Sequence, residues 1–483
     1  MQAVTTMRAQ NWTCLAALLL LGASAHADND AVSVTHHHFQ SGDRSFDYTA
    51  EAGRIAVEDD ASDKGSMFYT AYSVRGSHRP VTFLWNGGPG ANSAALHFEA
   101  FGPRRLAGGS LEDNSETLLT ASDVVFVDPI GTGFSRAAQP GAKSGFYSTL
   151  GDFAAMTDFV QKWLKSHHAE NLRVYLVGES FGVWRAAAVA EELEEKHQPV
   201  AGIVLISGGT GTANGVLPRP LSVALRTPGR TATALFHNKL PSAFGTDRDA
   251  IVNSATQWAE KRYAPALEQV ASLNDTERRK IAAELSLWTG LDAAQIDEKT
   301  LAVSPRQYLR TLLKGQTLDT FDMRRTEEPK GDNRPIMAYF KSDLAYATPL
   351  AYAGLDADPS PGDPTAPAPG VINSSWNYNS GPITPEVMAA AQAGEGPPGA
   401  QPWSLRAIAL DPALNVLVAA GLYDSLNSCA ANDALRERLD AKVRANFTMK
   451  CYAGGHMMYR DPAAHVQLSA DVRTFVSGAA HDR

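Results

Sequence analysis

Residues 174–183, with the sequence VYLVGESFGV, constrain the fold more than any other segment of this chain. An apolar run rich in β-branched residues predicts a buried strand, which ends in the G-x-S-x-G pattern at residues 178–182. Residues 184–193 then have the composition of a helix. A strand, a tight turn carrying Ser180 and a helix together form a nucleophile elbow, which presents the serine hydroxyl to a general base. The segment therefore predicts an α/β protein with a nucleophilic serine.

Further apolar runs predict that this strand belongs to a mostly parallel sheet. Several are continuous rather than alternating, which is typical of strands buried on both faces. Helical periodicity at residues 149–164 and 183–193 lies between some of them, so the pattern indicates an α/β sheet. The predicted strands are residues 67–74, 81–85, 124–127, 174–177, 203–206, 416–420 and 447–452.

The middle of the chain has a different character. From about residue 212 to 399 there is little strand signal, and the pattern predicts helices at residues 249–263, 276–289 and 305–314. Two Pro-rich passages, 356–370 and 394–399, cannot hold regular helix. We therefore expect an α/β core in two parts, 28–211 and 401–483, interrupted by a mainly helical insertion at 212–400 with Pro-rich loops.

The beginning of the chain has the features of a secretory signal peptide over residues 1–27. Arg8 supplies a positive charge, residues 15–21 an apolar region and residues 25–27 an A-x-A cleavage site. These features predict export to the periplasm or out of the cell. No later segment approaches the ~20 apolar residues that a membrane span needs, so we expect no stable membrane insertion.

Composition and cysteine content narrow the class of protein further. The chain of 483 residues is 44% hydrophobic and 20% charged, as in ordinary globular proteins, and its net charge of −9 argues against nucleic acid as a partner. Signal-peptide cleavage would remove Cys14 and leave Cys429 and Cys451 in an oxidising compartment. One disulfide between these two is the hypothesis, and two buried free thiols are the alternative.

Two strand-loop units after Ser180 supply an acid and then a histidine. Asp424 follows the predicted strand at 416–420, and His456 stands on a Gly-rich loop after the strand at 447–452. Serine, acid and histidine follow in this order in hydrolases built on the nucleophile elbow, so the pattern predicts a triad of Ser180, Asp424 and His456. The alternatives are a turn or helix-cap role for Asp424 and a structural role for His456, while Asp433 competes weakly because it lies inside the next predicted helix.

Two more glycine loops follow predicted strands and make the pattern specific to a family. Residues 86–90 read NGGPG, and residues 128–135 read DPIGTGFS. Exposed backbone N–H groups in such turns can complete an oxyanion hole. Together with the elbow and the acid and histidine loops, these motifs resemble the serine carboxypeptidase family, which has an α/β-hydrolase fold with a helical insertion over the site. The resemblance extends from about residue 65 to the C-terminus.

The resemblance implies a role for each matching residue. Ser180 would be the nucleophile, His456 the general base and acid, and Asp424 its orienting partner. The backbone N–H groups of Gly88 and Phe181 would form the oxyanion hole. The implied activity is removal of C-terminal residues from peptides, and no metal or organic cofactor is expected.

The resemblance also implies that Asn86 and Glu179 hold the C-terminal carboxylate of the substrate. Two carboxyl groups can share a hydrogen bond only if one is protonated, so free-acid peptides should bind more weakly as pH rises. Many family members have a glutamate at the position of Ala100, whereas here Glu99 is one residue out of register. The family disulfide that starts after NGGPG is absent, because Ala91 takes the cysteine position.

Two other functions are compatible with the same motifs. An esterase or acyltransferase would use the same triad, and Ala100 favours that alternative over strict exopeptidase activity. A non-catalytic peptide-binding protein is less consistent with an intact triad. The histidines at 36–38 and the glycine loop at 208–215 lack the spacing of a metal site or a nucleotide-binding loop.

Overall fold

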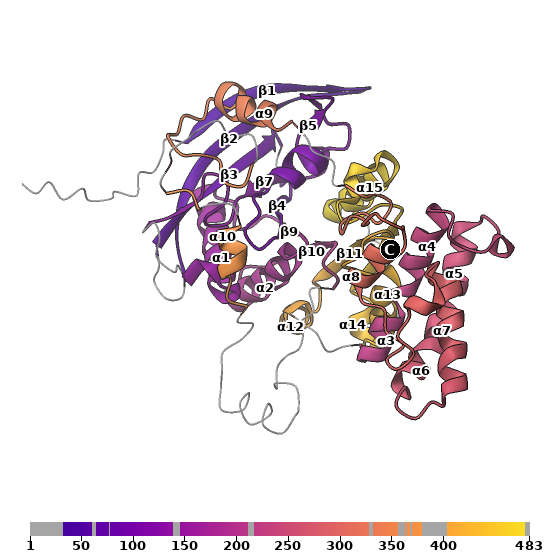
Figure 1. Ribbon diagram of the computed structural model, residues 1–483. Helices are drawn as coiled ribbons and strands as arrows, with labels where there is room; N and C mark the ends of the chain where they lie inside the picture. Colours follow the sequence, from indigo (N-terminus) through magenta and orange to yellow (C-terminus); the bar gives the residue numbers. More distant parts are fainter. Residues whose placement is uncertain are drawn as a thin grey trace, which may run out of the picture.

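The computed structural model describes most of the chain after residue 31 (Figure 1). The expected signal peptide, including Cys14, lies outside the described residues, as do the whole Pro-rich passage at 394–399 and most of that at 356–370. Among the described helices, none combines the length and apolar character needed to cross a membrane. The described residues are 32–59, 64–76, 78–138, 145–210, 217–327, 332–355, 363, 365–367, 370–378 and 403–478.

A ten-stranded sheet runs through the centre of the described structure. The seven predicted strands all lie in it, as β3, β7, β4, β9, β10, β11 and β12. The sequence did not predict β1 and β2. Most of β1 alternates between exposed and partly buried positions, and in β2 the buried residues Tyr48, Ala50 and Ala52 are separated by polar ones, so neither strand has a continuous apolar run. The strands, in spatial order, are β1 (Ser33–Ser41), β2 (Arg44–Glu58), β3 (Lys64–Val74), β7 (Asp123–Val127), β4 (Val81–Trp85), β9 (Val174–Glu179), β10 (Gly202–Ile206), β11 (Asn415–Gly421) and β12 (Phe447–Tyr452), with β8 (Arg136–Ala137) on β3.

Strand direction shows the fold class. β7, β4, β9, β10, β11 and β12 are parallel, whereas β1, β2 and β3 pair antiparallel and β3 meets β7 antiparallel. When the strands are numbered along the chain from β2, leaving out β8 and the two strands of a separate small sheet, their spatial order is 1-2-4-3-5-6-7-8. This confirms the α/β-hydrolase fold. The carboxyl ends of the parallel strands meet at one edge, where sites collect in such sheets.

Helices cover both faces of the sheet because the strands are apolar on both sides. In β9, Leu176 belongs to the core beneath α1 (Thr149–Ser166) and α2 (Gly182–Glu195), whereas its neighbours Tyr175 and Val177 belong to the opposite core. Helix α12 (Trp403–Leu410) packs beside α2. The opposite face is covered by α15 (Pro462–Ser477) and the π-helix η1 (Leu96–Phe101).

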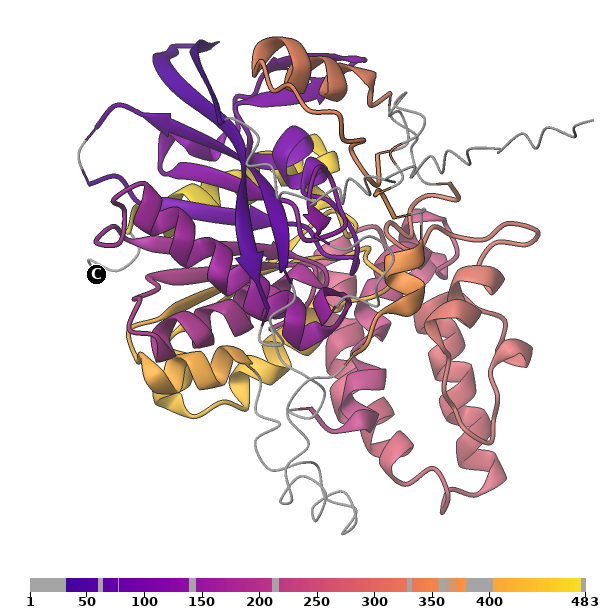
Figure 2. The same ribbon diagram turned by 90° about the vertical axis from the view of Figure 1, so that its left-hand side faces the viewer.

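The segment between β10 and α12 divides into two packed parts. Residues 217–327 form helices with a core of their own, which includes Tyr263, Leu285 and Tyr308, and they stand beside the end of the sheet that holds β11 and β12 (Figures 1 and 2). Residues 332–355 return to the sheet, where Phe340 packs against Phe68. The helices of this segment are α3 (Arg219–Ala224), α4 (Thr227–Phe236), η4 (Ser242–Phe244), α5 (Arg248–Trp258), η5 (Ala259–Tyr263), α6 (Ala264–Glu268), α7 (Asp275–Thr289), η6 (Ala293–Gln295), α8 (Pro305–Thr311), α9 (Arg334–Ala338), η7 (Tyr339–Asp343) and α10 (Val371–Ser375).

A disulfide joins the last two strand-helix units of the core. Cys429 opens α13 (Cys429–Glu437), and it is bonded to Cys451 in β12. The disulfide hypothesis is therefore confirmed. The remaining elements are β5 (Arg104–Ala107), β6 (Ser110–Asp113), η2 (Leu118–Thr120), η3 (Gly145–Tyr147), α14 (Ala441–Arg444) and η8 (Met458–Arg460).

Candidate active site

Ser180 stands on a sharp turn between β9 and α2. Its φ of +57° is in the left-handed region, which side-chain-bearing residues rarely adopt and which is the conformation of a nucleophile elbow. The turn needs glycine at position 178, because a Cβ there would lie 1.9 Å from the carbonyl oxygen of Gly182. The Ser180 N–H donates to the Ile206 carbonyl at 2.8 Å and ties the elbow to the next strand.

Asp424 and His456 lie side by side at the carboxyl ends of β11 and β12. His456 Nδ1 and Asp424 Oδ2 are 2.7 Å apart, and both side chains are buried. The Asp424 carboxylate also accepts from the Leu426 N–H and from Asn427 Nδ2, both at 2.8 Å. Burial by itself lowers the pKa of His456, but the charge and the hydrogen bond of Asp424 outweigh burial and raise it.

The other nitrogen of the histidine is available for chemistry. His456 Nε2 is buried and has no hydrogen-bond partner within the described part of the chain. The backbone around the ring is held firmly, because the His456 N–H donates to the Phe321 carbonyl at 2.6 Å and Ser207 Oγ donates to the His456 carbonyl at 2.5 Å. An imidazole that is oriented through Nδ1 and has no partner at Nε2 can accept a proton there as a general base.

The NGGPG loop lies directly against the elbow. It follows β4, whose Trp85 pairs with Gly178 of β9. At Gly87 a Cβ would lie 2.4 Å from the Phe181 nitrogen, so only glycine lets the two backbones approach this closely. The structure thus brings Gly88, one residue further along, and Phe181 into neighbouring loops, as an oxyanion hole requires.

A buried arginine fixes Asn86 and the helix after the elbow. Arg185 Nη1 donates to the Asn86 carbonyl at 2.7 Å, while Arg185 Nε and Nη2 hold the Asp152 carboxylate at 2.7 and 3.2 Å. The Arg185 side chain is fully buried, and its guanidinium lies 5.5 Å from the centre of the Phe181 ring. Asn86 is itself buried, and its Oδ1 accepts from the Leu96 N–H at 3.0 Å.

Glu179 lies near His456 and near the charges of Arg460 and Glu99. It is 4% exposed, and the fully buried Tyr459 donates its hydroxyl to Glu179 Oε2 at 2.6 Å. Burial raises the pKa of Glu179, against the opposing effects of His456, of the Tyr459 hydroxyl and of Arg460. Glu99, although out of register in the sequence, is near enough to raise this pKa further, and it pairs with Arg460 at 2.5 and 3.0 Å.

A short segment of the helical insertion reaches over the aspartate and histidine loops. We call residues 320–325 the cap strap. Its Met323 N–H donates to the Tyr423 carbonyl at 2.9 Å, and its Thr320 carbonyl accepts from Ser425 Oγ at 2.7 Å. Both contacts lie on the loop that carries Asp424.

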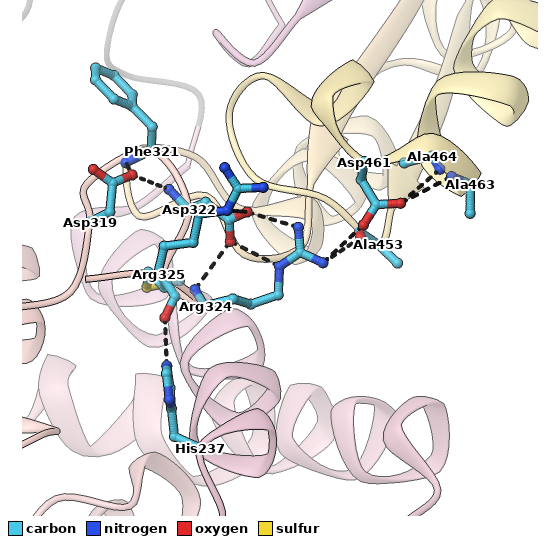
Figure 3. Close-up of polar contacts among 11 residues, drawn as sticks. His237, Asp319, Phe321, Asp322, Arg324, Arg325, Ala453, Asp461, Ala463 and Ala464 are labelled. Atoms are coloured by element: carbon cyan, nitrogen blue, oxygen red, sulfur yellow. Dashed lines mark hydrogen bonds and ion pairs between the residues drawn. The ribbon is translucent and has the colours of Figure 1, made fainter. Parts of the chain in front are cut away.

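Arg324 attaches the same strap to the histidine loop (Figure 3). Its guanidinium holds Asp322 at 2.8 and 2.9 Å and donates to the Ala453 carbonyl and to Asp461 at 3.2 Å each. It also lies 4.6 Å from the centre of the Tyr423 ring. The position of the strap is therefore coupled to both members of the aspartate-histidine pair.

The sequence did not identify Arg185, Tyr459, Arg460 or Arg324 as site residues. Tyr459 and Arg460 follow His456 by three and four residues on one loop, so proximity to the histidine was the signal that could have found them. Arg185 and Arg324 carry no local signal, because each acts on residues far away in the sequence.

Comparison with known proteins places the chain in a family. A model of the family described as "Serine carboxypeptidase" matches residues 42–298, more than half of the chain. The chain belongs to the serine carboxypeptidase family. Among similar family members, the pheromone-processing carboxypeptidase kex1 of Aspergillus niger is 27% identical over 199 residues, which are 40% of this chain and 32% of the relative. The serine carboxypeptidase-like protein 45 of Arabidopsis thaliana is 27% identical over 155 residues, 30% of this chain and 33% of the relative.

These alignments cover limited parts of the serine carboxypeptidases compared. The chain spans about a third of the length of the two relatives named. Among solved structures, a proline iminopeptidase from Mycobacterium smegmatis aligns with 88% of this chain and 97% of its own, at 12% sequence identity and a TM-score of 0.37.

Proposed function

We propose that this protein is an exported serine carboxypeptidase that releases C-terminal residues from peptides through an acyl-enzyme on Ser180. The observation that carries the proposal is the buried Asp424–His456 pair, whose Nε2 is unpartnered among the described residues, at the sheet edge that also holds the elbow serine. Membership of the serine carboxypeptidase family supports the same reaction.

The reaction follows from the roles of these three side chains. Ser180 Oγ attacks the carbonyl carbon of the last peptide bond while His456 Nε2 accepts the hydroxyl proton. His456 then gives this proton to the departing nitrogen, and the carbon-nitrogen bond breaks to leave an ester on Ser180. Water repeats the attack with His456 as base, so the shortened peptide leaves with a new carboxylate. The Gly88 and Phe181 N–H groups stabilise the oxyanion in both steps.

Glu179 and Asn86 are proposed to select a free C-terminus. A buried carboxyl with a raised pKa keeps its proton to higher pH than an exposed one and can then donate to the substrate carboxylate. The hydrogen bond from Arg185 to the Asn86 carbonyl fixes the backbone of Asn86, which supports the proposed role of this residue. Binding of free-acid peptides is therefore expected to weaken as pH rises and Glu179 loses its proton.

Export is proposed from the N-terminal sequence and the disulfide. Residues 1–27 have the charge, apolar region and cleavage site of a signal peptide. The Cys429–Cys451 bond supports an oxidising compartment such as the periplasm or the exterior.

A mass-spectrometric time course tests the proposed activity. One blocked peptide is offered as the free acid, as its C-terminal amide and as an ester, with Ser180→Ala as the control enzyme. We expect stepwise loss of single C-terminal residues from the free acid, with little trimming of the amide and none by the variant. Trimming that persists in Ser180→Ala would contradict the proposal.

An esterase or acyltransferase is the second candidate function. Many family members have a glutamate at the position of Ala100, where it helps to bind the substrate carboxylate, and that glutamate is missing here. The neighbouring Glu99 is paired with Arg460 instead, and this favours the second candidate. Ester cleavage without any peptide trimming in the same time course would establish this candidate and reject the carboxypeptidase.

A further inference from the structure

A cavity of about 240 Å³ lies between the helical insertion and the loop that carries Asp424. Arg226, Pro228, Gly229 and Arg230, around the start of α4, form one wall, and Ser425, Asn427 and the disulfide cysteine Cys429 contribute to another. For comparison, a water molecule takes up about 30 Å³ in the liquid, so the cavity has room for a small ligand. It does not include Ser180 or Glu179 among its lining residues.

Arg230 carries a charge into this cavity without a counter-charge. It is 4% exposed, its Nη2 donates to the Val303 carbonyl at 2.9 Å, and its guanidinium lies 5.2 Å from the centre of the Tyr308 ring. Within the described residues it makes no ion pair with a carboxylate. Burial lowers the pKa of Arg230 to about 10, and the groups that oppose this effect are the phenols of Tyr308 and Tyr263 rather than a carboxylate. A buried, unpaired cation is costly, so a counter-ion is expected beside it.

Arg226 lies one helical turn before Arg230 and lines the same cavity. Its Nη1 donates to the Ser425 carbonyl at 3.1 Å. Burial lowers the pKa of Arg226, and among the described residues Asp424 is the carboxylate whose charge opposes this effect. The Asp424 oxygens are already occupied by His456, Leu426 and Asn427. Asp424 therefore cannot neutralise two arginines.

The other carboxylates that line the cavity do not neutralise Arg226 or Arg230 either. Glu260 and Asp433 form no ion pair with Arg226 or Arg230 in the described part of the chain. Burial raises the pKa of Asp433, and the cation that opposes this effect is Arg436.

We propose that this cavity binds a small oxyanion between the guanidinium groups of Arg230 and Arg226. Guanidinium groups present N–H donors in a planar fork that matches phosphate, sulfate and carboxylate oxygens. The anion would supply the missing counter-charge of Arg230 and would sit beside the residues that follow Asp424. The inference goes beyond the proposed carboxypeptidase function and does not depend on it.

Thermal unfolding of the full chain with inorganic phosphate tests the site. At millimolar phosphate and constant ionic strength, balanced with chloride, we expect a saturable rise in Tm of about 1–3 °C up to ten times Kd. A parallel series with acetate shows which class of anion the cavity prefers. A larger rise in Tm with phosphate indicates a tetrahedral anion, and a larger rise with acetate indicates a carboxylate. No rise with either anion would overturn the proposal.

Substitution of the arginines shows whether the effect belongs to this cavity. Arg230→Met removes the guanidinium but keeps an unbranched apolar side chain, and it should abolish the rise without lowering the Tm measured in chloride. Arg226→Met should weaken phosphate binding at least tenfold. Arg262→Met is the matched control, because it removes a charge from the same insertion where Arg262 pairs with Glu277 and Glu284. An equal rise in Arg230→Met and in the control would overturn the site.

Discussion

Replacing Tyr459 by phenylalanine is expected to change the pH dependence of peptide binding. The substitution removes the fully buried hydroxyl that donates to Glu179 Oε2 at 2.6 Å. This hydrogen bond stabilises the charged form of Glu179 and opposes the rise in its pKa that burial causes. Without it, the pKa of Glu179 rises further, and the carboxyl keeps its proton to higher pH.

The size of the effect follows from the difference between two kinds of hydrogen bond. A bond to a charged acceptor contributes about 1.5–3 kcal/mol, and a bond to a neutral one about 0.5–1.5 kcal/mol. The difference of about 1.4 kcal/mol corresponds to a tenfold change in a protonation equilibrium. The midpoint of the rise in KM with pH should therefore move to higher pH by about one pH unit in Tyr459→Phe.

The assay measures KM from acid to alkaline pH for a free-acid peptide and for an ester of the same sequence. The ester has no carboxylate to bind, so its KM should show no midpoint in either enzyme. Glu179→Gln should make the KM of the free acid independent of pH, because an amide donates at every pH. Tyr452→Phe is the matched control, since Tyr452 donates to Asp471 at 2.8 Å in a similarly buried position.

A midpoint that stays in place in Tyr459→Phe, or that moves toward acid, would refute the reasoning. The same result in Tyr452→Phe as in Tyr459→Phe would also refute it, because the effect would then not depend on Glu179. Equal pH profiles for the acid and the ester in the unmodified protein would reject Glu179 as the carboxylate receptor.

Three further substitutions have expected outcomes. Arg324→Gln should lower kcat about tenfold with little change in KM, because the cap strap would no longer hold the aspartate and histidine loops together. Cys429→Ser should lower the free energy of unfolding by about 3 kcal/mol, because the bond to Cys451 closes a loop with a sequence separation of 22. Gly178→Ala should cost about 3 kcal/mol or more, since its Cβ would overlap the Gly182 carbonyl.

Each of these has a measurement that would contradict it. Arg325 is one residue along the strap, and its Nε lies 3.6 Å from Asp322 Oδ2. Because this contact is weaker, Arg325→Gln should leave kcat within about twofold. A loss of kcat equal to that of Arg324→Gln would reject a positioning role for Arg324. Chemical denaturation that shows no loss for Cys429→Ser would contradict the loop-closure argument. A Gly178→Ala protein that unfolds at the same denaturant concentration as the unmodified chain would contradict the elbow geometry.

The parallel half of the sheet could be predicted because each strand carries its own signal. Strands such as β9 and β10 are buried on both faces, so apolar residues follow one another without interruption. The elbow and the acid and histidine loops follow directly from strand ends and chain order. By contrast, β1 is the edge strand and β2 lies between β1 and β3, and the polar side chains that alternate along both strands leave no continuous apolar run.

The surroundings of the site could not be predicted because they depend on tertiary contacts. Arg185 reaches Asn86 from 99 residues away, and Arg324 reaches Ala453 from 129 residues away. Glu99 looks misplaced by one residue in the sequence, yet its pairing with Arg460 holds it near Glu179. Long-range electrostatics of this kind leave no pattern of spacing to recognise.

Detection of the acyl-enzyme tests the central claim most directly. A slowly hydrolysed ester substrate is mixed with the enzyme and quenched in acid, and the mass of the intact protein is recorded before peptide mapping. The account predicts a stoichiometric increase by the acyl group, mapped to Ser180 and absent from Ser180→Ala and from His456→Gln. Turnover without an adduct, or an adduct on another residue, would contradict it.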